Sequence, residues 1–188
     1  MLCTSPPRHP GTLLRLRSSM IGGASPRFRR SHGNYNFGVT GRSFALQAQH
    51  PAAYLDGDSV VQLDDGAVLS LAHDLRRSAS DDIEFAQAAF HWVRDEVGHS
   101  YDVRDPRVTL TAGEVLRERV GLCYAKSHLL AALLRVAGIP TGLCYQRLTH
   151  GDGYVLHGLV AVYLEGSWHR QDPRGNKEGG HCRVLPDR

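Results

Sequence analysis

The chain has 188 residues, 41% of them apolar and 22% charged, which is typical of a single globular domain. The formal net charge of +3 arises entirely in residues 1–43, where seven Arg meet no acidic residue. Residues 44–188 carry 15 basic and 19 acidic side chains, a net charge of −4 that argues against a basic nucleic-acid-binding domain. No apolar run approaches the roughly 18 residues of a membrane-spanning helix.

Residues 1–43 are rich in Arg, Ser, Gly and Pro and follow neither a helical nor a strand period. Because they offer few apolar side chains to offset the entropy of ordering, we expect a disordered tail. A start of translation further along, an organelle-targeting segment and a nucleic-acid-binding arm are the alternatives that this composition leaves open. The apolar stretch at 13–17 is too short and too charged for a secretion signal, so we expect a cytoplasmic protein with reduced thiols.

Three helices are predicted in the first half of the remaining chain. The turn at 64–66 precedes apolar residues with the spacing of one helix face. A second helix follows the capping residues at 80–82, and Gly98 is expected to end it. Thr111 and Glu114 have the spacing of a capping box and open a short third helix.

A longer helix is predicted from Leu122 to just before Gly138, and it is expected to be buried because apolar residues cover most of its circumference. The apolar period then changes to about two. Three strands are expected, at 141–148, 154–164 and 168–171. Helices followed by antiparallel strands predict an α+β domain over residues 44–180. Residues 181–188 are interpreted as an irregular tail or as a truncated end of the domain.

Three residues that can perform chemistry fall at predictable places in these elements. Cys123 lies in the first turn of the buried helix, where free backbone N–H groups and the helix dipole lower a thiol pKa. His157 lies in the second strand and Asp172 ends the third. A hairpin turn near residues 165–166 sets residue 157 opposite roughly residue 174, which brings His157 and Asp172 within hydrogen-bonding reach.

Taken singly, each of these residues has a structural interpretation, as a core cysteine, a core histidine and a turn aspartate. Taken together, they predict nucleophilic catalysis by Cys123. His157 is then the base that keeps the thiol ionised and protonates the leaving group, and Asp172 orients the imidazole.

The motifs around these residues resemble those of the transglutaminase-like superfamily, relatives of papain, in their small bacterial form. They are Gly-Leu-Cys-Tyr-Ala-Lys-Ser-His-Leu-Leu at 121–130, Arg-Val-Ala-Gly-Ile-Pro at 135–140, His157-Gly158, Asp-Pro-Arg-Gly-Asn at 172–176, and the lead-in helix at 92–97 followed by Tyr101-Asp102. The resemblance covers about residues 65–177. It implies a papain-like α+β fold in which Cys123, His157 and Asp172 are the catalytic residues.

The resemblance leaves the reaction open, since such a site forms a thioester that either water or an amine can resolve. We expect hydrolysis of a peptide or amide bond in a peptide or protein substrate. A protein-glutamine acyltransferase and a non-catalytic peptide-binding module are the alternatives. The family's second oxyanion donor comes from upstream, and Tyr101 is one candidate for it.

Several neighbouring residues have less specific interpretations. Tyr101 and Tyr124 are candidates for substrate contact, and His99 either flanks the cleft or plays an ordinary loop role. Lys126 and His128 could line the cleft, but on a helix such side chains more often reach solvent, which is what we expect here. No cofactor is expected. Zinc binding is disfavoured because no closely spaced pair organises its possible ligands. Those ligands would be Cys123, Cys144, His157 and Cys182.

Overall fold

A computed structural model of the chain describes residues 2–4, 50–150 and 152–175. Most of the segment predicted as a disordered tail, residues 44–49, 151 and 176–180 of the predicted domain, and the tail at 181–188 lie outside these ranges. The elements are a 3-10 turn η1 (Pro51–Tyr54), helices α1 (Gly66–Arg77), α2 (Asp82–Glu96), α3 (Ala112–Glu118) and α4 (Cys123–Val136), and strands β1 (Leu2–Thr4), β2 (Gly98–His99), β3 (Val120–Gly121), β4 (Thr141–His150), β5 (Gly153–Leu164) and β6 (Ser167–Gln171).

The helices begin where the capping residues of the sequence place them. The carboxylates of Asp65 and Asp81 accept hydrogen bonds from first-turn N–H groups of α1 and α2, and Thr111 forms the predicted capping box with Glu114 at the start of α3. Gly98 ends α2 as predicted: the helix runs to Glu96, Val97 is its C-cap with extended backbone angles, and Gly98 follows as the first residue of β2.

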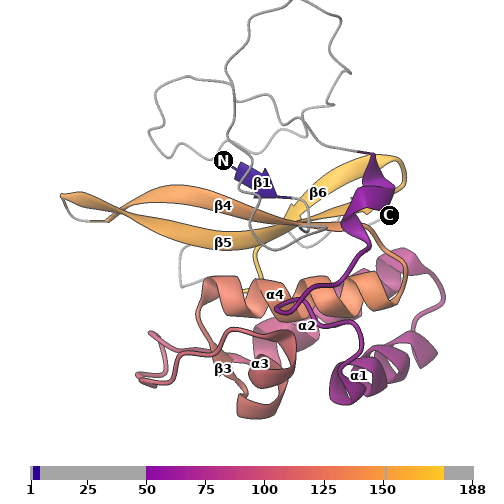
Figure 1. The fold of residues 1–188 in the computed structure, drawn as a ribbon, viewed down its shortest axis with the longest axis horizontal. Helices are drawn as coiled ribbons and strands as arrows, with labels where there is room; N and C mark the ends of the chain where they lie inside the picture. Colours follow the sequence, from indigo (N-terminus) through magenta and orange to yellow (C-terminus); the bar gives the residue numbers. More distant parts are fainter. Residues whose placement is uncertain (1, 5–49, 151, 176–188) are drawn as a thin grey trace, which may run out of the picture.

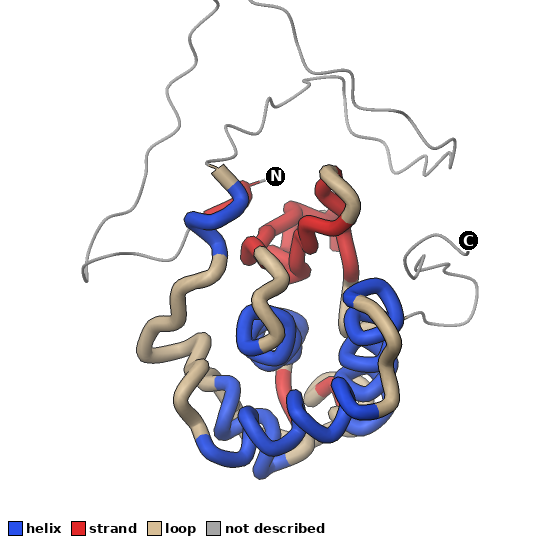
Figure 2. The backbone as a smooth tube through the Cα atoms, turned by 90° about the vertical axis from the view of Figure 1, so that its right-hand side faces the viewer, coloured by secondary structure: helices blue, strands red, loops and turns tan. Residues whose placement is uncertain are grey.

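The antiparallel sheet has the order β1-β4-β5-β6, and the helices pack on one side of it (Figures 1 and 2). Helix α4 lies between the sheet and the other helices and contacts β5 as well as α1, α2 and α3. Its apolar circumference is explained by this position, because neighbours surround it and Leu129, Leu130 and Leu133 are fully buried. The predicted α+β class is confirmed.

Strand β1 was not expected. Leu2–Thr4 pairs antiparallel with β4, with Cys3 opposite Cys144, although the sequence predicts a disordered tail over residues 1–43. Strand pairing depends on main-chain hydrogen bonds that the apolar period of so short a segment does not reveal.

In the described part of the chain, none of the helices combines the length and the apolar character needed to span a membrane.

Candidate active site

Cys123 occupies the first position of α4, as predicted. Its N-cap, Leu122, makes no side-chain hydrogen bond to the first turn, so no capping side chain engages the N–H groups there. The thiol is only partly buried. On the sheet side, the backbone N–H of Gly158 in β5 donates to Sγ of Cys123 over 3.3 Å.

This contact requires helix α4 and strand β5 to approach each other unusually closely. A Cβ atom on Gly158 would lie 2.7 Å from Cα and 2.9 Å from Cβ of Tyr124. Glycine at 158 therefore lets the strand reach the helix start and places the neighbouring His157 beside the thiol.

His157 and Asp172 meet across the hairpin of β5 and β6. The ladder pairs Val160 with Gln171, and continuing the same register sets residue 157 level with residue 174, as the sequence predicts. Nε2 of His157 lies 2.6 Å from Oδ2 of Asp172, and Oδ1 of Asp172 accepts a hydrogen bond from the Arg174 backbone N–H. The structure thus brings Cys123, His157 and Asp172 together.

The surroundings shift the two titrating groups in opposite directions. Burial raises the pKa of the Cys123 thiol, but hydrogen bonds with His157, His99 and the Gly158 N–H outweigh burial and bring the pKa to about 6. The hydrogen bond to Asp172, followed by the one to Cys123, raises the pKa of His157 to about 9 against the opposing effect of burial. Between these two pH values the pair is a thiolate and an imidazolium.

A second imidazole, that of His99, also contacts the thiol. Strand β2 pairs with β3 so that His99 lies opposite Gly121, two residues before Cys123. The His99 side chain is buried, forms a hydrogen bond with Cys123, and has its Nδ1 atom 3.6 Å from Oδ2 of Asp102. The sequence points to His99 only as one of two residues beside the cleft, because a two-residue strand leaves no periodic signal.

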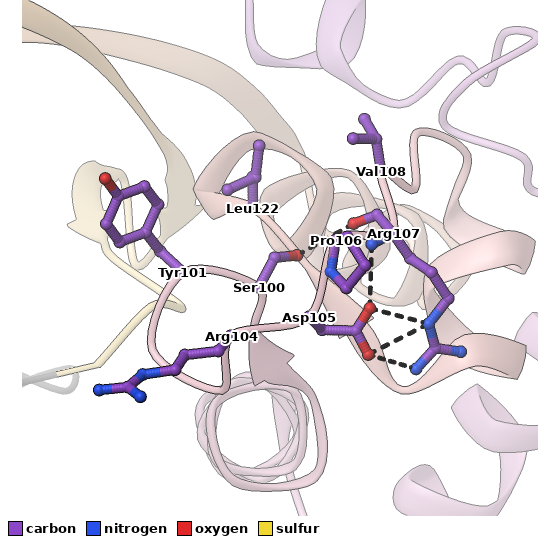
Figure 3. A pocket seen from close by; sticks show the side chains of 8 residues that line it. All are labelled: Ser100, Tyr101, Arg104, Asp105, Pro106, Arg107, Val108 and Leu122. Atoms are coloured by element: carbon purple, nitrogen blue, oxygen red, sulfur yellow. Dashed lines mark hydrogen bonds and ion pairs between the residues drawn. The ribbon is translucent and has the colours of Figure 1, made fainter.

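A cavity of about 390 Å³ lies beside the start of α4 (Figure 3), and Cys123 is not among the residues that line it. Leu122, the residue before Cys123, forms part of its wall, and Tyr101 and Val108 line it with exposed apolar surface. Of the two tyrosines predicted to contact substrate, Tyr101 lines this cavity. Tyr124 is not among its lining residues and packs against the core and the ring of His128.

The prediction that Lys126 and His128 reach solvent is wrong, because both are buried. Nζ of Lys126 donates to the carbonyl oxygens of Arg94 and Val97 at the end of α2, and Nδ1 of His128 lies 2.8 Å from the Leu110 carbonyl oxygen. Each polar end group meets a backbone carbonyl oxygen of another segment of the chain. The spacing of residues along α4 does not reveal such partners.

Within residues 2–4, 50–150 and 152–175, no group of three or more His, Cys, Asp or Glu side chains is arranged to hold a metal ion. Cys182, one of the four ligands considered for zinc, lies outside the described residues.

Comparison with known proteins adds a family and several similar folds. The model of the transglutaminase-like superfamily matches residues 69–173. The kyphoscoliosis peptidase of Mus musculus is 30% identical over 114 residues, which cover 54% of this chain and 17% of the mouse protein. The chain therefore spans about a sixth of that relative.

Two solved structures share the fold. A candidate cysteine protease from Cytophaga hutchinsonii superposes with a TM-score of 0.55 at 21% identity, covering 64% of this chain and 40% of the other. The periplasmic domain of TgpA from Pseudomonas aeruginosa, bound to ethylmercury, gives a TM-score of 0.50 at 20% identity, covering 65% and 48%.

Proposed function

The chain belongs to the transglutaminase-like superfamily, and on this premise we propose that it hydrolyses peptide or amide bonds through a thioester on Cys123. His157 is the general acid and base of this reaction, and Asp172 holds the imidazole. The observation that carries the proposal is the pairing of a thiol whose pKa is about 6 with an imidazole whose pKa is about 9, because this pair is nucleophile and proton donor at neutral pH.

The reaction balances with the groups present. The Cys123 thiolate attacks the carbonyl carbon, forming a C–S bond and moving one electron pair of the carbonyl onto oxygen. When the carbonyl re-forms, the C–N bond breaks and the imidazolium of His157 gives its proton to the departing amine. Water then attacks the thioester carbon and passes a proton to His157. The C–S bond breaks with its electron pair going to sulfur, the carboxylic acid leaves, and the proton on His157 restores the thiolate–imidazolium pair.

Two features favour water as the acceptor of the acyl group. The site opens to solvent, since Cys123 is only partly buried and the Asp172 side chain is 30% exposed. The mouse relative is named a peptidase. A thioester at this position is within reach of bulk water, whereas transfer to an amine requires that water be kept away.

The test is to trap the acyl-enzyme. The full chain is mixed with a panel of peptide p-nitroanilides and peptide amides, quenched in acid and analysed by mass spectrometry. We expect an acyl adduct on the peptide that contains Cys123, release of the free acid, and no adduct or turnover in Cys123→Ala at unchanged thermal stability.

The other outcomes contradict the proposal in distinct ways. Efficient incorporation of an added amine such as putrescine into glutamine peptides, with little free acid, would show a protein-glutamine acyltransferase. Peptide binding without any adduct, unaffected by alkylation of Cys123, would show a non-catalytic module. Equal turnover by the wild type and Cys123→Ala would exclude Cys123 as the nucleophile.

A further inference from the structure

Two imidazole–carboxylate pairs converge on one thiol. His157 with Asp172 approaches from the four-stranded sheet, and His99 approaches from β2, with Asp102 in the turn that follows this strand. The proposed hydrolysis uses only the first pair, so the burial of the second beside the same sulfur needs its own explanation.

The orientation of His99 is set by its surroundings. Its Nδ1 atom is buried, faces Asp102 across 3.6 Å and makes no hydrogen bond within the described part of the chain. The hydrogen bond with Cys123 therefore involves the other ring nitrogen, Nε2. The main chain around His99 is fixed as well, since the N–H of Ser100 donates to the Gly121 carbonyl oxygen over 3.2 Å.

Arg174 joins the two carboxylates. Its Nη2 atom lies 3.1 Å from Oδ1 of Asp102, while its backbone N–H donates to Oδ1 of Asp172 over 3.0 Å. One residue therefore sets the position of both acids and, through them, of both imidazoles.

A tetrahedral intermediate on Cys123 needs donors for its oxyanion. The Cys123 N–H at the uncapped start of α4 supplies one. Of the groups that contact Sγ, His157 is engaged as acid and base, which leaves His99 as the side-chain donor beside the main-chain N–H of Gly158. Tyr101, the candidate suggested by the sequence, is 77% exposed and therefore is not held in place for this role.

We propose that His99 is the side-chain oxyanion donor of this site, with Asp102 and Arg174 as its positioning residues; this inference rests on the proposed hydrolysis. His99 donates a hydrogen bond through Nε2 to the carbonyl oxygen as that oxygen gains negative charge. No proton is transferred in this interaction, and the bond weakens again when the carbonyl re-forms and the amine leaves.

The experiment compares His99→Gln and His99→Leu with the wild type. The Gln side chain can present an amide N–H near the place of Nε2, whereas Leu has no donor. His73→Gln, at an exposed position on α1, is the matched control. Two rates are measured on each folded protein: kcat on the p-nitroanilide that the wild type cleaves fastest, and the maximal rate of iodoacetamide alkylation of Cys123 on the alkaline plateau.

Alkylation at carbon creates no oxyanion, so the two rates separate an oxyanion donor from a group that only helps ionise the thiol. We expect His99→Leu to lower kcat by about 10²–10³-fold, as the loss of one such donor does in other enzymes, with the alkylation plateau changed by less than about threefold. His99→Gln should recover at least a tenth of the wild-type kcat.

Three results would overturn the assignment: His99→Leu as active as His73→Gln, kcat and the alkylation plateau falling by the same factor, or His99→Gln no better than His99→Leu at equal thermal stability. In each case an active wild type leaves the proposed hydrolysis standing. If the wild type cleaves none of the probes, the proposed function fails and the assignment of His99 fails with it.

Discussion

Gly158 and Tyr124 meet with almost no space between strand and helix: a Cβ on the glycine would lie 2.7 Å from the tyrosine Cα. The neighbour is backbone at the start of α4, which cannot rotate away as a flexible side chain can. The separation of the thiol from the His157 strand is therefore set by the absence of one methyl group.

Gly158→Ala should consequently impair both stability and chemistry. Overpacking of this kind costs about 1–3 kcal/mol, and moving β5 away from α4 weakens the contact of the N–H with Sγ. Thermal unfolding and the kcat of peptide p-nitroanilide cleavage measure the two effects. Gly153→Ala, on the same strand but with the nearest atom 3.9 Å away, is the control and should change neither by much.

Alkylation of Cys123 should follow a titration centred near pH 6, because hydrogen bonds from two histidines and the Gly158 N–H outweigh the effect of burial on the thiol pKa. The thiolate is present above that pH, so labelling by iodoacetamide should rise from pH 5 and level off near pH 7. Peptide mapping locates the label at Cys123, because Cys144 is disulfide-bonded and has no thiol to alkylate. A midpoint near the ordinary cysteine pKa of about 8.5 would contradict the described site.

The alkaline limit of activity should depend on Asp172. The imidazolium of His157 is required to protonate the departing amine, and its pKa of about 9 is raised above the ordinary value chiefly by Asp172. Activity in the wild type should therefore fall above about pH 9. In Asp172→Asn the same limb should move toward about pH 6.5, with kcat/KM reduced at every pH. An unmoved alkaline limb in the variant would show that Asp172 does not set the pKa of His157.

Asp102 and Arg174 should act as one unit. Arg174→Met removes the guanidinium from Asp102 but keeps the backbone N–H that binds Asp172. We expect kcat to fall while the alkaline limb stays in place. Combined with Asp102→Asn in a double-mutant cycle, the two changes should be non-additive by about 0.5–3 kcal/mol in the activation free energy. Additive effects would mean that the two side chains act independently; Arg77→Met, at an exposed position on α1, controls for loss of an arginine.

Lys126→Met should destabilise the chain. The Lys126 ammonium group donates to the carbonyl oxygens of Arg94 and Val97, and these acceptors lose that donor in the variant. An unsatisfied buried carbonyl costs about 1–3 kcal/mol. Urea unfolding measures the loss, and an unchanged midpoint would show that other groups can satisfy these carbonyls.

The sequence anticipates those parts of the structure that are encoded locally. Asp65, Asp81 and the Thr111–Glu114 pair begin the helices because a capping side chain acts within three residues of its own position. The proximity of His157 to Asp172 along the hairpin is predictable, because the position of the turn fixes the register of the two strands.

The missed features depend on contacts between distant segments. His99 reaches Cys123 through a two-residue parallel pairing of β2 with β3, and Lys126 finds its acceptors about 30 positions away along the chain. Neither contact leaves a periodic pattern, so neither is readable without the folded arrangement.

The hairpin register also decides which changes of length the site can accept. Successive residues of a strand face opposite sides of the sheet. One residue added after Leu164, in the turn before β6, would shift every later position by one and turn Asp172 to the side opposite His157. Two added residues would return Asp172 to the same side of the sheet as His157, but would displace its carboxylate along the strand by two residues. The spacing of 15 residues between His157 and Asp172 is thus part of the chemistry, as much as the identity of either side chain.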